Sequence, residues 1–203
     1  MELAEQHLAE LVVVGSSSSG LLGRIALGSV TEHLVHTAEV AVAIAPRGYP
    51  STPLPLQRLT VAYGGAADAA ELIRTGAELA KPWRVRMRIA SFTVRPTTMF
   101  GGSIARSAED LVTEQWTRKT LQSARKQLDA VRSTISIPDA DVVLGTGTDW
   151  PDAVGDIAWE SGELLLLGSA AAGPRAQVFL GSAASKILRH VPVPAMIVPR
   201  RHP

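Results

Sequence analysis

The chain has 203 residues, 46% of them hydrophobic and 19% charged, and 20 basic against 19 acidic residues give a net charge of +1. This composition predicts a globular protein with material for one domain, or for one and part of a second. The balanced charge argues against a nucleic-acid partner, and the absence of cysteine excludes disulfides and thiolate chemistry. No apolar run approaches the roughly 18 residues of a membrane span. We therefore expect a cytoplasmic protein with no membrane partner.

Two stretches of the chain follow one pattern: LVVVGSSSSGLLGRIALGS at 11–29 and LLLLGSAAAGPRAQVFLGS at 164–182. A shift of 153 residues, from Gly15 to Gly168, aligns 11–47 with 164–200 without a gap, and this is an internal repeat. Each copy predicts a buried parallel strand, a Gly-rich loop, a helix of about ten residues that begins at Gly-Ser, and a second strand that ends in Pro-Arg.

The residues between the two copies predict alternating strands and helices. In chain order we expect a strand at 58–65, a helix at 66–81, a strand at 83–94, a loop at 95–105, a helix at 106–132 with Leu111, Trp116, Leu121 and Leu128 inward, a strand at 139–147, and a helix at 149–162 capped by Asp149. Such alternation predicts a parallel sheet with helices on both faces, a doubly wound α/β fold.

The repeat also predicts the domain organisation. Residues 58–203 supply five strands and read as one complete domain, whereas 1–50 supply only the C-terminal half of another; the Pro-rich segment 51–57 reads as a linker. We expect the strand at 40–46 to pair antiparallel with the strand at 193–199, which relates the copies by a pseudo-twofold axis. The sheet edge that the half domain leaves open predicts a homodimer, formed through sheet edges or through the final strands.

The repeat resembles the universal stress protein family in its tandem form. The residues that carry the resemblance are Gly15, Gly28 and Ser29 with TEHLVHTAEVAVAIAPR, and Gly168, Gly181 and Ser182 with SKILRHVPVPAMIVPR. The resemblance implies a Rossmann-like, adenine nucleotide alpha hydrolase-like sheet of order 3-2-1-4-5, a role in stress response, ATP binding in one subgroup, and no defining catalytic chemistry.

The ATP-binding subgroup carries Gly, two residues, Gly, nine residues, then Gly and Ser or Thr. Such glycines let backbone amides approach phosphate oxygens, and the last pair adds a hydroxyl and helix N-terminal amides. The middle glycine is missing from both copies here, and Gly20 and Gly173 come two places late. The positions in chain order are Gly15, Ser18, Gly28 and Ser29 in the first copy, and Gly168, Ala171, Gly181 and Ser182 in the second.

Other residues leave alternatives open. ATP-binding relatives place Asp at the end of the first strand, where this chain has Gly64. Ser29 with Glu32 also fits a capping box, and Arg175 fits either a phosphate contact or an exposed loop charge. We find no metal-ligand set and no convergent catalytic residues. The sequence therefore favours a non-catalytic interaction module with a degenerate nucleotide site; the alternative is an ATP-binding universal stress protein, with ATP as the one candidate cofactor.

Overall fold

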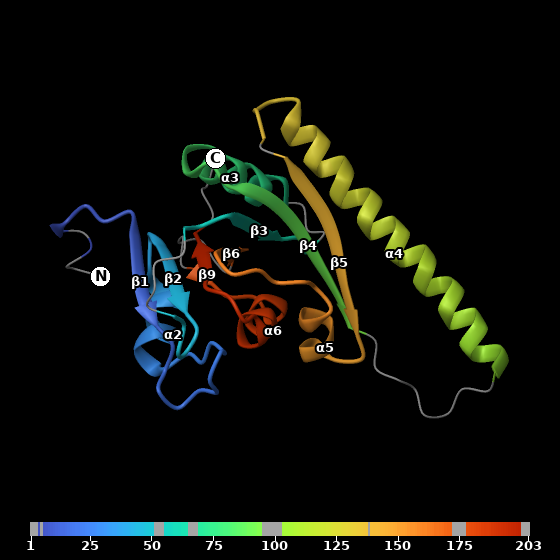
Figure 1. The fold of residues 1–203 in the computed structure, drawn as a ribbon, viewed down its shortest axis with the longest axis horizontal. Helices are drawn as coiled ribbons and strands as arrows, with labels where there is room; N and C mark the ends of the chain where they lie inside the picture. The colour runs from blue at the N-terminus through green and yellow to red at the C-terminus, as the bar shows by residue number, and fades with distance from the viewer. Residues whose placement is uncertain are drawn as a thin grey trace. The chain divides into compact units, whose positions relative to one another are not determined.

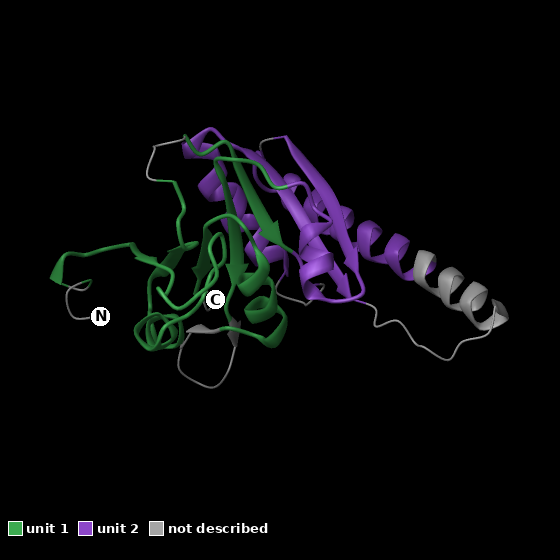
Figure 2. Cartoon of the chain, turned by 60° about the horizontal axis from the view of Figure 1, so that its bottom comes forward, with its two compact units in different colours: residues 1–62, 159–203 green, residues 63–158 purple. Residues whose placement is uncertain are grey.

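A computed structural model describes residues 4, 6–50, 55–64, 69–94, 103–137, 139–171 and 178–199, excluding the side chains of 103–114, 170, 171, 178 and 179. The chain divides into two compact units (Figure 2). Unit 1 comprises 1–62 and 159–203, so it contains both copies of the repeat, and unit 2 comprises 63–158.

Unit 1 is built on five strands in the order β1-β2-β9-β6-β3 (Figure 1). The strands are β1 (Leu11–Gly15), β2 (Ala41–Ala45), β3 (Arg58–Ala62), β6 (Glu163–Gly168) and β9 (Ala195–Val198). Helix α2 (Ser29–Thr37) connects β1 to β2, and α6 (Ser182–His190) leads from β6 into β9. Two short strands, β7 (Ala170–Ala171) and β8 (Val178–Phe179), form an antiparallel pair between β6 and α6.

The two copies have the same internal geometry. Val12 of β1 lies opposite Val42 of β2 in a parallel pair, and the residues 153 positions later, Leu165 of β6 and Ala195 of β9, are also opposite one another. Pairing inside each copy therefore has an identical register. Side chains on both faces of the central strands are buried, as in the run Leu165, Leu166 and Leu167, which explains why these strands read as continuous apolar segments. The prediction of a buried strand is wrong for the first copy, because every residue of β1 is exposed or half-buried.

The copies join where β2 pairs with β9, and this pair is antiparallel. Ala43 lies opposite Met196, its own equivalent under the 153-residue shift. The flanking pairs, Val42 with Ile197 and Ile44 with Ala195, exchange equivalent positions, as a twofold axis requires. The predicted antiparallel pairing of 40–46 with 193–199 is confirmed.

Unit 2 contains β4 (Arg86–Val94) and β5 (Ala140–Gly147) in a parallel pair, with helices α3 (Ala69–Trp83), α4 (Ser103–Arg132) and α5 (Trp150–Gly155). Tyr63, the residue after β3, donates its backbone N–H to the carbonyl of Ala90 in β4 at 2.7 Å. The predicted order 3-2-1-4-5 thus appears as β3-β6-β9 in unit 1 and as the β4–β5 pair in unit 2. The fold is α/β, as predicted.

Two predicted details of unit 2 are wrong. The helix after Asp149 ends at Gly155 rather than at 162, although Asp149 does cap it by accepting a hydrogen bond from the N–H of Asp152 at 2.9 Å. Trp116 of α4 is 53% exposed instead of inward, whereas Leu128 is buried as expected. Among the described side chains of α4, which do not include Leu111, burial begins after Trp116, a boundary that helical periodicity alone does not mark.

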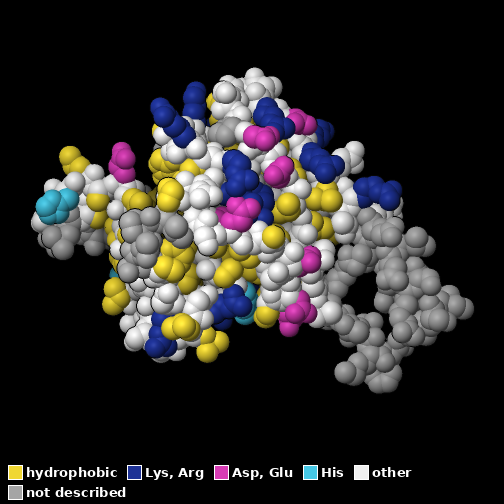
Figure 3. Space-filling view, viewed as in Figure 1, with side chains coloured by type: hydrophobic (Ala, Val, Ile, Leu, Met, Phe, Trp, Pro, Cys, Tyr) yellow, Lys and Arg dark blue, Asp and Glu magenta, His cyan; other side chains and the backbone are white. Residues whose placement is uncertain are grey.

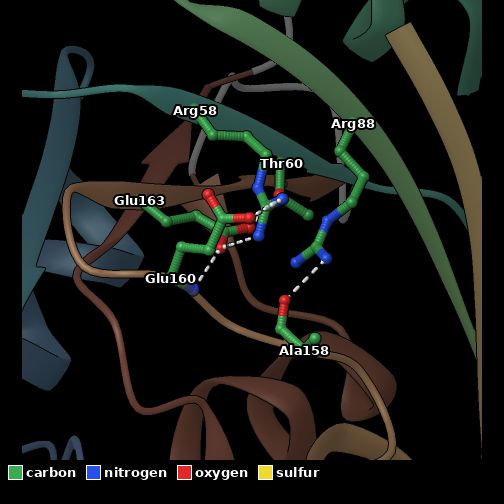
Figure 4. Close-up of polar contacts among 6 residues, drawn as sticks. All are labelled: Arg58, Thr60, Arg88, Ala158, Glu160 and Glu163. Atoms are coloured by element: carbon green, nitrogen blue, oxygen red, sulfur yellow. Dashed lines mark hydrogen bonds and ion pairs between the residues drawn. The ribbon is translucent and has the colours of Figure 1, made fainter.

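A buried ionic network ties β3 to β6 at the amino ends of these strands (Figure 4). Glu163 is 1% exposed, and Arg58 Nη2 binds its carboxylate at 2.7 Å. Thr60 Oγ1 donates to the same carboxylate, and Arg58 Nη1 binds Glu160 at 2.8 Å. Burial opposes the charge on Arg58, but hydrogen bonds and Coulombic attraction from Glu163 and Glu160 raise the pKa of Arg58 above its ordinary value.

Replacement of Glu163 by Ala is expected to destabilise the fold severely, because it leaves the Arg58 guanidinium buried without its main counter-charge. Loss of one partner of a buried pair costs about 3–5 kcal/mol. Urea unfolding measures the loss. Glu160→Ala is the matched control: this side chain is 43% exposed, so its removal should cost no more than about 1 kcal/mol. Equal losses of unfolding free energy in the two variants would contradict the assignment of Glu163 as the main counter-charge of Arg58.

Two glycines of β5 allow α5 to approach the strand closely. A methyl group at Gly145 would lie 2.2 Å from the carbonyl oxygen of Ala153, and one at Gly147 would lie 2.3 Å from the Ala153 nitrogen. Backbone atoms of α5 occupy the space that a side chain would need, and neither can move without displacing the helix. These glycines therefore fix where α5 lies on β5.

Replacement of Gly147 by Ala should consequently destabilise the protein by about 2 kcal/mol or more, as overpacking of a closed contact does. The control is Gly155→Ala within α5, where an added methyl meets nothing within 4 Å. Because Ala is favoured over Gly in a helix, that variant should be neutral or gain up to about 1 kcal/mol. Thermal unfolding distinguishes the two, and a neutral Gly147→Ala variant would contradict the close approach.

Candidate functional site

Most of the predicted cradle residues lie at two equivalent places in unit 1. Gly15 ends β1 and Gly168 ends β6, while Gly28 and Gly181 are the N-cap residues of α2 and α6. Ser29 and Ser182 are the first residues of these helices, as the sequence predicts. In each copy the structure therefore has a strand end, a loop and a helix N-terminus in the order that an anion cradle uses.

The capping-box interpretation of Ser29 with Glu32 is wrong. Gly28 occupies the N-cap with φ −80° and ψ 165°, and Ser29 lies one residue inside the helix. Among the described residues no side chain caps α2, and the same holds for α6 at Gly181. An uncapped first turn leaves backbone N–H groups for water or for an anion.

The first loop is closed by its own hydrogen bonds. Ser16 donates its backbone N–H to Ala45, and Ser17 donates to Ala26, each at 2.9 Å. The Ser16 hydroxyl also accepts from the Ala26 N–H at 2.8 Å and approaches the Ala26 carbonyl at 3.3 Å. Gly20 donates to the Ser17 carbonyl at 3.1 Å. The amides of Ser16, Ser17 and Gly20 are thus already bonded to backbone carbonyls of β2 or of the loop itself.

Gly20 has a packing role in this closed loop. A Cβ at Gly20 would lie 2.6 Å from the Cβ of Ala26, so only glycine fits opposite that residue. The late glycine of the first copy therefore serves the closure of the loop, and it does not replace the missing glycine at Ser18.

Two arginines complete the closure. Arg47 Nη1 donates to the Gly20 carbonyl at 2.6 Å, and the Arg47 carbonyl accepts from the Gly23 N–H at 2.8 Å. Arg24 reaches across to the second copy, where its Nη1 donates to the carbonyl of His190. The sequence analysis missed the contribution of Arg47, because this residue lies 27 positions from Gly20.

The second copy is described in part. Gly173 and Arg175 lie outside the described residues, so their predicted contacts are not placed. Ala171, which stands where ATP-binding relatives have the middle glycine, belongs to β7 and lies opposite Val178 of β8. Ala171 is therefore part of a strand pair. A glycine in a turn with positive φ could not form this pair.

Gly64 lies in unit 2, directly after Tyr63. Among the described residues, nothing lies within 4 Å of a Cβ placed at this glycine.

A cavity of about 390 Å³ in unit 1 lies beside the closed loop and does not include the predicted cradle glycines. Its lining consists of Leu21, Arg24, Ile25, Ala26, Leu27, Glu32, Arg189 and His190. The described part of the chain contains no group of three potential metal-ligating side chains. Within the same residues, no helix is both long and apolar enough to cross a membrane.

The parallel strands, crossover helices and paired Gly-rich loops define an α/β protein with a doubly wound sheet. The sequence model of the universal stress protein family matches residues 1–46 and 55–199, and the chain belongs to this family. Universal stress proteins of Mycobacterium tuberculosis and Mycobacterium bovis are each 36% identical to it over 201 residues, which is 98% of this chain and 67% of theirs.

Solved structures agree on the fold. A universal stress protein from Archaeoglobus fulgidus superposes with a TM-score of 0.57 at 18% identity, covering 98% of this chain and 66% of the other. A protein of unknown function from Pseudomonas aeruginosa has a TM-score of 0.56 at 12% identity, covering 97% and 65%. The chain thus spans about two thirds of the length of these relatives.

Replacement of Ser16 by Ala is expected to open the first loop, because its hydroxyl holds both backbone groups of Ala26. Loss of such a part-buried hydrogen bond costs about 0.5–1.5 kcal/mol, and hydrogen exchange at the Ala26 amide should accelerate. The control is Ser18→Ala in the same loop, which should leave both measurements unchanged. Unaltered exchange at Ala26 in the Ser16→Ala variant would show that the loop is held by other contacts.

Proposed function

We propose that this universal stress protein acts in stress response as a non-catalytic interaction module whose nucleotide site is degenerate. The observation that carries the proposal is the closed first loop, in which the amides of Ser16, Ser17 and Gly20 are bonded to the protein itself. A phosphate could bind there only by breaking these bonds, and backbone hydrogen bonds that must be exchanged give little net binding energy.

The second copy supports the same proposal. Ala171 stands in place of the middle glycine and lies in the β7–β8 pair, and Gly64 carries no carboxylate for a ribose. The middle glycine and the ribose-binding carboxylate, which a nucleotide would need in addition to the helix N-terminus, are therefore both missing. No acid, base and nucleophile converge among the described residues of either loop, which favours a role in assembly over catalysis.

The strand pairing in unit 1 limits the surfaces through which such assembly could occur. The final strands β2 and β9 are joined to one another within one chain, and each has a second neighbour, β1 or β6. Pairing of two copies through these strands, one route to the expected homodimer, would have to break existing pairs. In unit 1 the outer edge of β1 is the better surface for a partner.

A second candidate function is ATP binding by the second copy. It is favoured by the N-terminus of α6, where Gly181 is the N-cap and no described side chain caps the helix. Ser182 is exposed at that first turn. A helix N-terminus with free amides attracts phosphate.

The double variant Gly64→Asp, Ala171→Gly distinguishes the two functions. The wild type should bind ATP weakly or not at all in calorimetry. Restoring the carboxylate and the flexible loop should produce measurable binding, because charge-assisted hydrogen bonds contribute about 1.5–3 kcal/mol each. The gain corresponds to roughly two to four orders of magnitude in Kd.

Ser182→Ala in the double variant should reduce that gain, whereas Ser29→Ala, its equivalent in the closed copy, should not. Tight binding by the wild type would establish the second candidate and overturn the degenerate site. A double variant that still binds nothing would show that the pocket is closed for reasons other than these two residues.

A further inference from the structure

The cavity of about 390 Å³ in unit 1 lies where the first Gly-rich loop meets the C-terminal end of α6. Small-molecule sites in proteins typically begin at about 300 Å³. Ile25 of its lining is 2% exposed, whereas Leu21, which lines the same cavity, is 78% exposed. Hydrophobic and basic side chains lie side by side on this part of unit 1 (Figure 3). The cavity therefore offers both apolar surface and charge to a ligand.

Three charged side chains line this cavity: Arg24, Glu32 and Arg189. Arg24 is half-buried, and its Nη1 donates to the carbonyl of His190, which holds the guanidinium in place. The other side-chain N–H groups of Arg24 and the whole guanidinium of Arg189 have no partner among the described residues. Within the same residues Glu32 forms no ion pair. Because each guanidinium has several N–H donors, most of this donor capacity is available to a ligand.

The internal repeat shows that the fold does not require these charges. Helices α2 and α6 begin and end at equivalent residues under the 153-residue shift. Glu32 of α2 corresponds to Ser185 of α6, and Arg189 of α6 corresponds to His36 of α2. A charge needed for the packing of these helices would recur in both copies. Since neither charge recurs, and both side chains are exposed, a ligand of the cavity explains them better than packing does.

We propose that this cavity binds a small apolar carboxylate. Its hydrocarbon chain contacts the leucine and isoleucine side chains of the lining, and its carboxylate accepts hydrogen bonds from Arg24 and Arg189. Guanidinium groups suit carboxylates because two parallel N–H groups meet two oxygens. The lining carries one positive charge in excess, with histidine counted as neutral, which matches a monoanion, and Glu32 repels a second negative charge. The cradle glycines do not line this cavity, so the inference goes beyond the proposed function.

Octanoate is the probe, titrated into the full chain by calorimetry. It should bind saturably, whereas 1-octanol, with the same chain length and no charge, should bind about tenfold more weakly or not at all. Arg189→Gln should weaken octanoate binding about tenfold, as loss of a hydrogen bond between charged groups does. Glu32→Gln should strengthen octanoate binding about threefold, because it removes an exposed like charge. A gain of affinity in this second variant is a result that a damaged fold cannot produce.

Two controls isolate the cavity. Lys186→Gln removes an exposed positive charge of α6 that does not line the cavity, so octanoate affinity should be unaltered. The amide signal of Ile25 should shift during the titration, whereas those of Gly168 and Ser182 in the second copy should not. Thermal unfolding of Arg189→Gln without octanoate should match the wild type, because Arg189 is exposed.

Absence of saturable octanoate binding would overturn the proposal, as would binding that Arg189→Gln does not weaken. Equal affinities for octanoate and 1-octanol, or equal losses in Arg189→Gln and Lys186→Gln, would show that no specific carboxylate contact exists and would overturn it as well. Shifts centred on Gly168 would place the probe in the predicted nucleotide cradle and contradict the cavity. The ATP titration of the double variant involves none of the cavity residues, so failure of this inference is distinguishable from failure of the proposed function.

Discussion

The antiparallel pair between β2 and β9 is the contact on which the organisation of unit 1 depends. The first copy has two strands and one helix, too little to form a stable sheet in water by itself. Pairing with β9 extends the sheet of the second copy, and it buries Val42, Ile44 and Ile197. Both copies have the same internal register. The antiparallel β2–β9 pair therefore determines how the first copy is oriented relative to the second. Ala43 and Met196 then lie where the pseudo-twofold axis crosses the sheet.

Much of this fold could be predicted from the sequence because its signals are local. Strands buried on both faces appear as unbroken apolar runs, and Gly-Ser after a loop marks each helix start. The antiparallel pair agrees with the dimer-like pairing through the final strands that the family resemblance implies. The short helix α5 and the exposed Trp116 could not be predicted in the same way. Their boundaries depend on packing: Gly145 and Gly147 admit α5 against β5, and among the described side chains of α4 burial begins only after Trp116.

The candidate site was less predictable, and the reason lies in the Gly-rich loop itself. A segment of glycine and serine can turn its amides toward a phosphate or toward its own chain. In the first copy the outcome is decided by Ala26 and Arg47, which lie outside the spacing pattern. Motif spacing places glycines correctly at Gly15 and Gly28. It carries no information about which acceptors the amides between them find.

Comparison of Glu10 with Glu163 shows how one residue acquires two environments. Glu163 is buried because Arg58 and Thr60 of the adjacent strand compensate its charge, and without them desolvation of the carboxylate would be unfavourable. Glu10 precedes a strand whose outer edge has no such neighbour among the described residues, and it remains in water. Edge strands usually carry lysine, proline or bulges that discourage pairing. Strand β1 reads LVVVG and carries none of these, so the contrast between Glu10 and Glu163 shows that burial of the carboxylate depends on the neighbouring strand.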